Sequence, residues 1–127
     1  MREILFRGKR IDNGEWVEGC FIEPNAIFSK DCASGSFGTI KGIKQSIGLD
    51  VYLVNPETVG QFTGLTDKNG VKIFEGDILQ DKNEYGTLNC FVVYEHHYWR
   101  FRGKNVYLNF HSEMLVIGNI HDNPELL

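Results

Sequence analysis

The chain has 127 residues, of which 42% are hydrophobic and 13% aromatic, and its formal net charge is −4. This composition excludes intrinsic disorder, which needs few aromatic residues and a high net charge, and it fits one domain or two very small ones. The acidic balance also argues against a protein that holds nucleic acid mainly by neutralising phosphates, although it leaves room for a local basic patch.

The cysteines and the N-terminus indicate the compartment. Cys20, Cys32 and Cys90 are odd in number and share no CxxC spacing, which predicts free thiols in a reducing cytoplasm and no zinc site. The opening MREILFRGKR has only three consecutive apolar residues before Arg7, so we expect neither a signal peptide nor a membrane anchor. No residue pattern requires a cofactor. The sequence therefore indicates a soluble intracellular protein.

Residues 1–55 have the two-residue periodicity of half-buried β-strands. Asn13-Gly14 is a strong hairpin signal, because a type I′ turn requires positive φ at both central residues. The return strand EWVEGCFI contains Trp16 as a core residue. Residues 30–38, KDCASGSFG, are small and polar, which predicts a mobile loop. This first part is expected to be β-rich, with one hairpin near its start.

The seam between two parts of the chain is expected at NPETVG, followed by the second part, residues 56–127. Asn55 before Pro56 is typical of a helix N-cap with proline at the first helical position, so one helical turn is predicted here. The run over residues 85–104 and the terminal EMLVIGNI predict further strands. Since no window has a sustained helical repeat, we predict a mainly β fold of antiparallel strands and hairpins with little helix.

Residues 64–79, GLTDKNGVKIFEGDIL, gather several acidic side chains, which raises the question of a calcium loop. An EF-hand loop needs oxygen ligands at positions 1, 3 and 5, glycine at position 6 and glutamate at position 12. Counted from Asp67, the sequence fails at positions 5, 6 and 12. Asn69-Gly70 therefore predicts a hairpin turn.

The same stretch contains a glycine next to a carboxylate. Gly76 is expected to bend the strand, and Asp77 to cap nearby backbone N–H groups rather than to perform chemistry. Asp67, Glu75 and Asp77 are kept as a candidate polar cluster, although no spacing in the sequence requires them to meet.

Three blocks of the chain, REILFRGKRIDNGEWVEG, NPETVGQFTGLTDKNGVKIFEGDIL and VIGNIHDNPELL, resemble the YopX family of small proteins from phages and prophages of Gram-positive bacteria. The resemblance extends over nearly the whole chain, apart from residues 25–47. It implies a β-rich protein with an SH3-like barrel in its C-terminal part, encoded in a phage-type genome. It implies no established activity, cofactor or catalytic residue, so no functional residue is carried over.

Catalytic signatures are lacking in the sequence. His96 and His97 are adjacent, so on a strand they would point to opposite faces and could not bind one metal ion together. No GxSxG, HExxH or glycine-rich phosphate loop occurs. Cys90 lies in an apolar strand, where a thiol is usually inert. The sequence favours a protein that is not an enzyme.

The segment HHYWRFRGK supplies the candidate contact residues. A strand over this segment would place alternate side chains on one face. That face would comprise His96, Tyr98, Arg100 and Arg102, with Lys104 nearby. An exposed tyrosine among arginines can stack a base while the cations contact phosphates. The alternative is a solvent-facing strand that carries Arg and Tyr only because it is solvated, and both interpretations stay open.

The expected function is that of a phage-encoded accessory protein that binds an unidentified host or phage protein. Nucleic-acid binding is the alternative, and a carboxylate-based enzyme is a third reading. SH3-like barrels commonly present an aromatic groove or a sheet edge to a partner. A strand at residues 37–43 or 50–54 could form such an edge and pair two subunits, so a homo-oligomer is expected. The predicted core comprises Ile4, Phe6, Trp16, Phe62, Ile73, Phe74, Ile78, Val92, Trp99, Phe101, Leu115 and Ile117.

Overall fold

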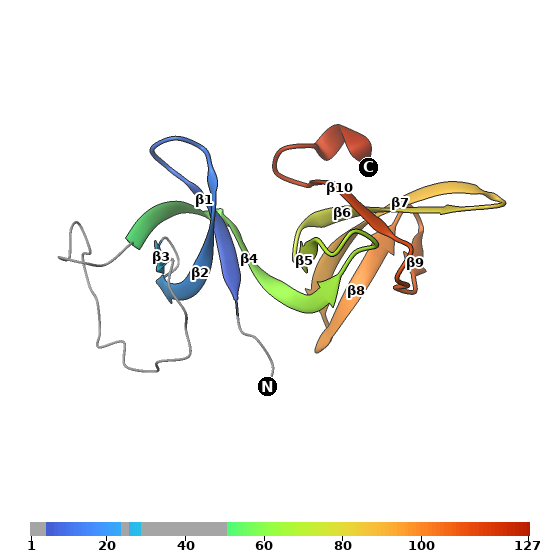
Figure 1. Ribbon diagram of the computed structural model, residues 1–127, viewed down its shortest axis with the longest axis horizontal. Coiled ribbons are helices and arrows are strands. Elements are labelled where there is room, and N and C mark those ends of the chain that lie inside the picture. Colours follow the sequence, from blue (N-terminus) through green and yellow to red (C-terminus); the bar gives the residue numbers. More distant parts are fainter. Residues whose placement is uncertain (1–4, 24–25, 29–50) are drawn as a thin grey trace. The chain divides into compact units, whose positions relative to one another are not determined.

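The computed structural model describes residues 5–23, 26–28 and 51–127, which belong to two units, Met1–Gln61 and Phe62–Leu127 (Figure 1). The described residues are mostly antiparallel β-strands with one short 3-10 helix, η2 (Pro124–Leu126), so the predicted fold class is confirmed. No helix in these ranges has the length and apolar character needed to cross a membrane. The predicted loop at 30–38 and the strand at 37–43 lie outside the described residues.

The first unit is a ring of antiparallel pairings. β1 pairs with β2, β2 with β3, β3 with β4, and β4 returns to pair with β1. Its strands are β1 (Phe6–Arg10), β2 (Trp16–Glu23), β3 (Ala26–Phe28) and the first part of β4 (Val51–Thr66). Ile27 and Val54 are fully buried inside the ring. Of the strand predicted at 50–54, the described residues 51–54 do not form a free edge, because β4 has β3 on one side and β1 on the other.

The first hairpin is confirmed, but its turn is longer than predicted. β1 and β2 are joined by residues 11–15, and the N–H of Arg10 donates to the carbonyl of Glu15 at 2.8 Å. Only Gly14 has positive φ, at 73°, whereas a type I′ turn needs two such residues. Asn13 instead accepts a hydrogen bond from the N–H of Glu15 through Oδ1, at 2.9 Å.

The helical turn predicted at residues 55–60 is wrong, because these residues lie within β4. The pairing of β1 with β4 shifts its register at this point, so this part of β4 forms a bulge. Asn55, which suggested a helix cap, instead stabilises the bulge: its Oδ1 accepts a hydrogen bond from the N–H of Glu57 at 3.1 Å. Thr58 Oγ1 donates to the Asn55 carbonyl and accepts from the N–H of Lys9.

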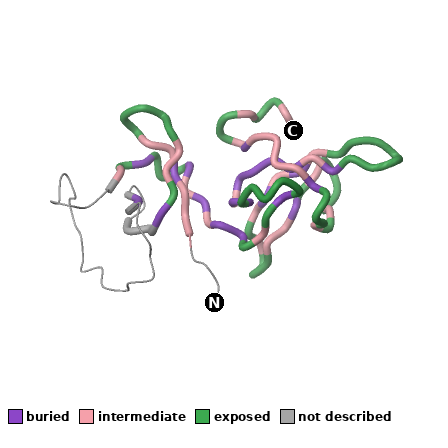
Figure 2. Tube along the Cα trace, viewed as in Figure 1, coloured by how far each residue is buried: buried purple, intermediate pink, exposed green. Residues whose placement is uncertain are grey.

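The second unit is a curled five-stranded antiparallel sheet in the order β10-β6-β7-β8-β9, and β5 pairs with the end of β4 (Figure 1). The strands are β5 (Lys72–Phe74), β6 (Asp77–Asn83), β7 (Gly86–Glu95), β8 (Tyr98–Gly103), β9 (Val106–Leu108) and β10 (Leu115–Asn119). An SH3-like barrel remains a prediction for this unit. Its buried core, purple in Figure 2, comprises Ile73, Leu79, Cys90, Val92, Phe101 and Met114.

Half of the predicted core is buried. These residues are Phe62, Ile73, Phe74, Ile78, Val92 and Phe101. The half-buried ones are Phe6, Trp16, Trp99, Leu115 and Ile117, and Ile4 lies outside the described residues. Leu79 and Met114 are fully buried although the sequence analysis did not select them. Met114 precedes its strand, so strand periodicity could not identify it.

Candidate interaction surface

Asp67 organises the turn between β4 and β5, and the predicted hairpin at Asn69-Gly70 is confirmed. Its Oδ1 accepts from the N–H groups of Asn69 (2.8 Å) and Val71 (2.9 Å). Its Oδ2 accepts from Val116 N–H, in β10, at 3.0 Å. Burial alone would raise the pKa of this carboxyl, but the three N–H donors outweigh it and lower the pKa. Asp67 therefore joins two parts of the unit that lie far apart in sequence.

Asp77 has the capping role that the sequence predicts. It is 1% exposed, and its Oδ2 accepts from Phe74 N–H at 2.7 Å. Gly76 has φ of 91° and makes the sharp turn between β5 and β6. Within the described hydrogen bonds, Asp67 and Asp77 serve different backbone segments. Glu75, which lies between the two aspartates in the sequence, is half-buried.

An Asp–His contact that the sequence does not signal links β6 to the segment before β10. His111 Nε2 lies 2.8 Å from Asp81 Oδ1, and His111 Nδ1 accepts from Glu113 N–H at 3.3 Å. The tautomer that fits both contacts has its hydrogen on Nε2, which then donates to the carboxylate. Both ring nitrogens are occupied, so neither is left to act as a general base. The pair is separated by 30 residues, and no local pattern could have revealed it.

Cys90 is an inert core thiol, as its apolar strand predicts. Its side chain is fully buried, and burial, together with the nearby Asp81 charge, raises the pKa of the thiol to about 11. Such a thiol is almost never ionised near neutral pH. The side chain of Cys20 and the whole of Cys32 fall outside the described parts. Among the residues that the structure describes, no three His, Cys, Asp or Glu side chains are grouped so as to hold a metal ion.

The run over residues 85–104 is not one strand, because a tight turn divides it into β7 and β8. Glu95 faces Tyr98 across the hairpin, and the two turn residues between them both have positive φ. His96 has φ of 51° and His97 has φ of 71°. Positive φ at both central residues is the property of a type I′ turn. The prediction that His96 shares a strand face with Tyr98 is therefore wrong.

The other candidate contact residues follow the predicted alternation along β8. Tyr98 is 69% exposed and Arg102 is exposed. Phe101, which lies between them in the sequence, belongs to the core and is only 6% exposed. Arg100 is half-buried, and its guanidinium carbon lies 4.0 Å from the centre of the Tyr107 ring. The Tyr107 hydroxyl in turn donates to Glu95 Oε1 at 3.2 Å. Lys104 lies in the turn between β8 and β9.

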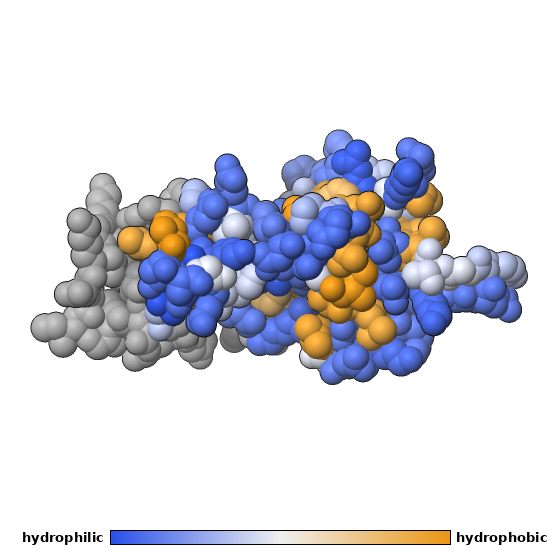
Figure 3. All heavy atoms as spheres, turned by 90° about the horizontal axis from the view of Figure 1, so that it is seen from above, coloured by the Kyte–Doolittle hydropathy of each residue, from blue (hydrophilic) through white to orange (hydrophobic). Residues whose placement is uncertain are grey.

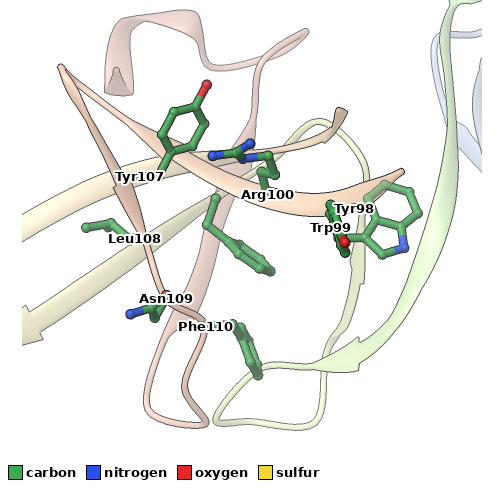
Figure 4. Close-up of a pocket in the computed structure, with 8 residues that line it drawn as sticks. Tyr98, Trp99, Arg100, Tyr107, Leu108, Asn109 and Phe110 are labelled. Carbon is green, nitrogen blue, oxygen red and sulfur yellow. The ribbon is translucent and has the colours of Figure 1, made fainter. Parts of the chain in front are cut away.

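An open pocket of about 340 Å³ lies where β8 and β9 diverge (Figure 4). Arg100 and Tyr107 point toward each other on one side of the opening, and Phe110 lies on the other (Figure 4). Its lining is mostly aromatic: Tyr98, Trp99, Arg100, Phe101, Tyr107, Leu108, Asn109 and Phe110. We refer to Tyr98, Arg100, Arg102, Lys104 and Tyr107 together with this pocket as the β8–β9 surface.

A second pocket of about 270 Å³ lies beside the turn that joins β8 to β9 and beside the C-terminal residues Leu126 and Leu127. It is lined largely by leucine and valine side chains, among them Leu88, Val106 and Leu126. Asn89 closes one wall, where its Nδ2 donates to the carbonyl of Leu126 at 2.8 Å. Apolar side chains also reach the surface of the second unit, as an orange patch bordered by polar atoms shows in Figure 3.

Comparison with known proteins places the chain in a family. No curated protein matches it. Among solved structures, the crystal structure of protein EF1440 from Enterococcus faecalis is similar, with a TM-score of 0.58 and 30% sequence identity. The match covers 100% of this chain and 99% of that one. The YopX protein family matches residues 5–127, so the resemblance noted in the sequence is confirmed and the chain belongs to the YopX family.

Proposed function

We propose that this protein is a binding module without a catalytic role, and that the β8–β9 surface contacts a partner protein. The observation that carries the proposal is the open aromatic pocket beside exposed cations. Aromatic and arginine side chains are the residue types that contribute most at protein interfaces. Residues 98–110 contain three cations and no acidic residue, although the whole chain has a net charge of −4.

The roles of the titratable residues support a binding module over an enzyme. Asp67 and Asp77 accept hydrogen bonds from backbone N–H groups, which is a structural role. His111 has both ring nitrogens engaged, and Cys90 is buried with a raised pKa. A catalytic base or nucleophile needs a free lone pair that a substrate can reach.

The biological setting remains a prediction. Family membership supports an accessory protein of a phage or prophage that acts in the cytoplasm of the bacterial host on a host or phage protein. A homo-oligomer is still expected on general grounds, and light scattering at micromolar concentration would measure it. If a homo-oligomer forms, the second copy of the chain either covers the β8–β9 surface and competes with the partner for it, or binds elsewhere and leaves that surface free.

Affinity capture with matched variants tests the proposal. The tagged protein is incubated with nuclease-treated host lysate, and captured proteins are identified by mass spectrometry. The test variant is Tyr98→Ala with Arg102→Ala, both exposed side chains. The control variant is Tyr85→Ala with Lys82→Ala, which removes a tyrosine and a cation from exposed positions in the β6–β7 hairpin. We expect a stoichiometric partner that the test variant loses and the control retains; equal capture by both variants would contradict the proposal.

Single-stranded nucleic acid is the second candidate, because Tyr98 is exposed beside Arg100 and Arg102. A base could stack on the tyrosine while the arginines contact phosphates. Binding to a labelled oligonucleotide would then weaken with salt, with a slope of about −0.7 for each phosphate contacted. Substitution of Arg100 and Arg102 by alanine should abolish this binding. Retention by a folded double variant would exclude the nucleic-acid reading.

A further inference from the structure

The outer edge of β8 is only partly covered. β9 has three residues, and they pair with Phe101, Arg102 and Gly103. The preceding residues of β8, Tyr98–Arg100, have β7 on one side and no paired strand on the other among the described residues. Beyond Leu108 the chain leaves the sheet, and the pocket of about 340 Å³ opens at this point.

The hairpin geometry fixes which backbone groups face the open edge. Gly103 and Val106 flank a two-residue turn, so their backbone groups form a hydrogen-bonded pair. Hydrogen-bonded and non-hydrogen-bonded pairs alternate along an antiparallel ladder, so Phe101 and Leu108, two residues further along each strand, also form a hydrogen-bonded pair. The direction of N–H and C=O alternates along a strand. Continuing the alternation, the N–H and C=O of Trp99 point to the open edge, while those of Arg100 point to β7.

The side chains around this edge define what could pair with it. Trp99 and Phe110 supply apolar surface, and Phe110 packs on Phe101 with ring centres 5.4 Å apart. On the opposite face of β8 lie Arg100 and Arg102. A strand placed against Trp99 would set one side chain beside the aromatic rings. Its two neighbours would lie opposite Tyr98 and Arg100, on the other face, because successive side chains alternate between faces.

From this arrangement we infer that the open edge of β8 binds an extended, acidic segment of the partner protein as an added strand. The partner residue opposite Trp99 is apolar. The residues on either side of it lie opposite Tyr98 and Arg100, on the face of β8 that carries the arginines, and they are acidic. Main-chain hydrogen bonds to Trp99 supply part of the affinity, and the pocket and the arginines supply the selectivity. This inference rests on the proposed function, because it assigns a chemistry to the partner of the β8–β9 surface.

Amide hydrogen exchange tests the premise on the free protein. The Trp99 amide should exchange with solvent at least about tenfold faster than the amide of Arg100, which is bonded to β7. On addition of the captured partner, the Trp99 amide should become protected. Equal protection of the two amides in the free protein would show that the edge is already occupied and would overturn the inference.

Peptide selection tests the chemistry. A displayed library of random heptapeptides is selected on the protein, with the Tyr98→Ala and Arg102→Ala variant for counter-selection. Enriched peptides should alternate acidic and apolar residues. Peptides without this alternation, or no enrichment over the variant, would overturn strand addition. Lysate capture that still depends on Tyr98 and Arg102 would then leave the proposed function standing, with a folded surface as the partner.

A backbone substitution separates strand addition from side-chain contact. Because the chain has a cysteine at position 90, ligation to a synthetic peptide of residues 90–127 can introduce N-methyl-tryptophan at position 99. This change keeps every side chain and removes the outward N–H of Trp99. The selected peptides should lose binding at least about tenfold relative to the unmethylated ligation product. Unchanged binding would overturn the inference, as would loss of the fold, because an open edge should accommodate the added methyl group.

Discussion

At the scale of single residues, the carboxylates of the second unit are explained by the backbone groups that they bind. Asp67 accepts hydrogen bonds from three backbone N–H groups, and Asp77 accepts one from Phe74 N–H, in positions where water has little access. An unpaired buried N–H is costly, so such carboxylates stabilise the fold. The role of Asp77 is local and was predictable from Gly76 beside it. The bond from Asp67 to Val116 spans 49 residues, and nothing in the sequence indicates it.

The lowered pKa of Asp67 predicts a pH-dependent contribution to stability. A carboxyl whose pKa is lower in the folded state stabilises the fold fully above its unfolded pKa of 3.8. That contribution is lost as the pH falls through the folded pKa. Asp67→Asn should therefore destabilise the protein by about 2 kcal/mol at pH 7, and by progressively less below about pH 4.

Urea denaturation of the wild-type protein and of Asp67→Asn across this pH range measures the difference in unfolding free energy. Glu113→Gln provides a control, since this exposed carboxylate makes only a surface ion pair with Lys68, at 3.4 Å. A difference for Asp67→Asn that stays constant as the pH falls would contradict the assignment.

At the scale of elements, strand periodicity was a good guide and turn chemistry a partial one. Both Asn-Gly pairs mark hairpins, but in each case only the glycine has positive φ. The type I′ conformation occurs at His96-His97, a turn that contains neither asparagine nor glycine and so has no sequence signal. Histidine tolerates positive φ better than most residues, and the pairing of β7 with β8 imposes the turn. Tertiary pairing therefore decided where the long run over residues 85–104 divides.

Replacement of the two turn histidines should stabilise the hairpin. His96→Asn with His97→Gly supplies the preferred type I′ sequence, and glycine relieves the cost of φ at 71°. We expect a gain of about 0.5–1 kcal/mol in unfolding free energy, measured by urea denaturation. Capture of the partner should not change, because the inferred contacts begin at Tyr98. A loss of binding in this more stable variant would place the histidines in the interface.

The first unit offers a prediction from close packing. Gly8 in β1 lies so near β4 that an added Cβ would come within 2.9 Å of Val54 Cβ and 3.1 Å of Ile27 Cδ1. Both neighbours are fully buried and have little room to move. Gly8→Ala should therefore destabilise the protein by about 1–3 kcal/mol in urea denaturation. Gly8→Ala with Val54→Ala should recover part of the loss, whereas a single variant as stable as wild type would refute the packing argument.

At the scale of the whole molecule, an acidic chain carries a basic surface. The total charge could be read from the sequence, and the alternation along β8 was predicted correctly for Tyr98, Arg100 and Arg102. The pocket could not be predicted, because it depends on how early β9 ends and where the chain then goes. Its location is therefore a product of the tertiary fold, while its charge is a property of the local sequence.

This contrast of charges predicts how the partner associates. Cations at the edge of an interface attract an acidic partner during the encounter, and salt screens this attraction. Arg102→Ala with Lys104→Ala should therefore lower the association rate with the captured partner about tenfold at low salt and change the dissociation rate little. At high salt the variant and the wild type should converge. Stopped-flow measurements over a range of NaCl concentrations would show this. The control is Lys82→Ala, which removes one exposed cation from β6. Rates that differ equally at all salt concentrations would mean that the two cations act by direct contact rather than by attraction at a distance.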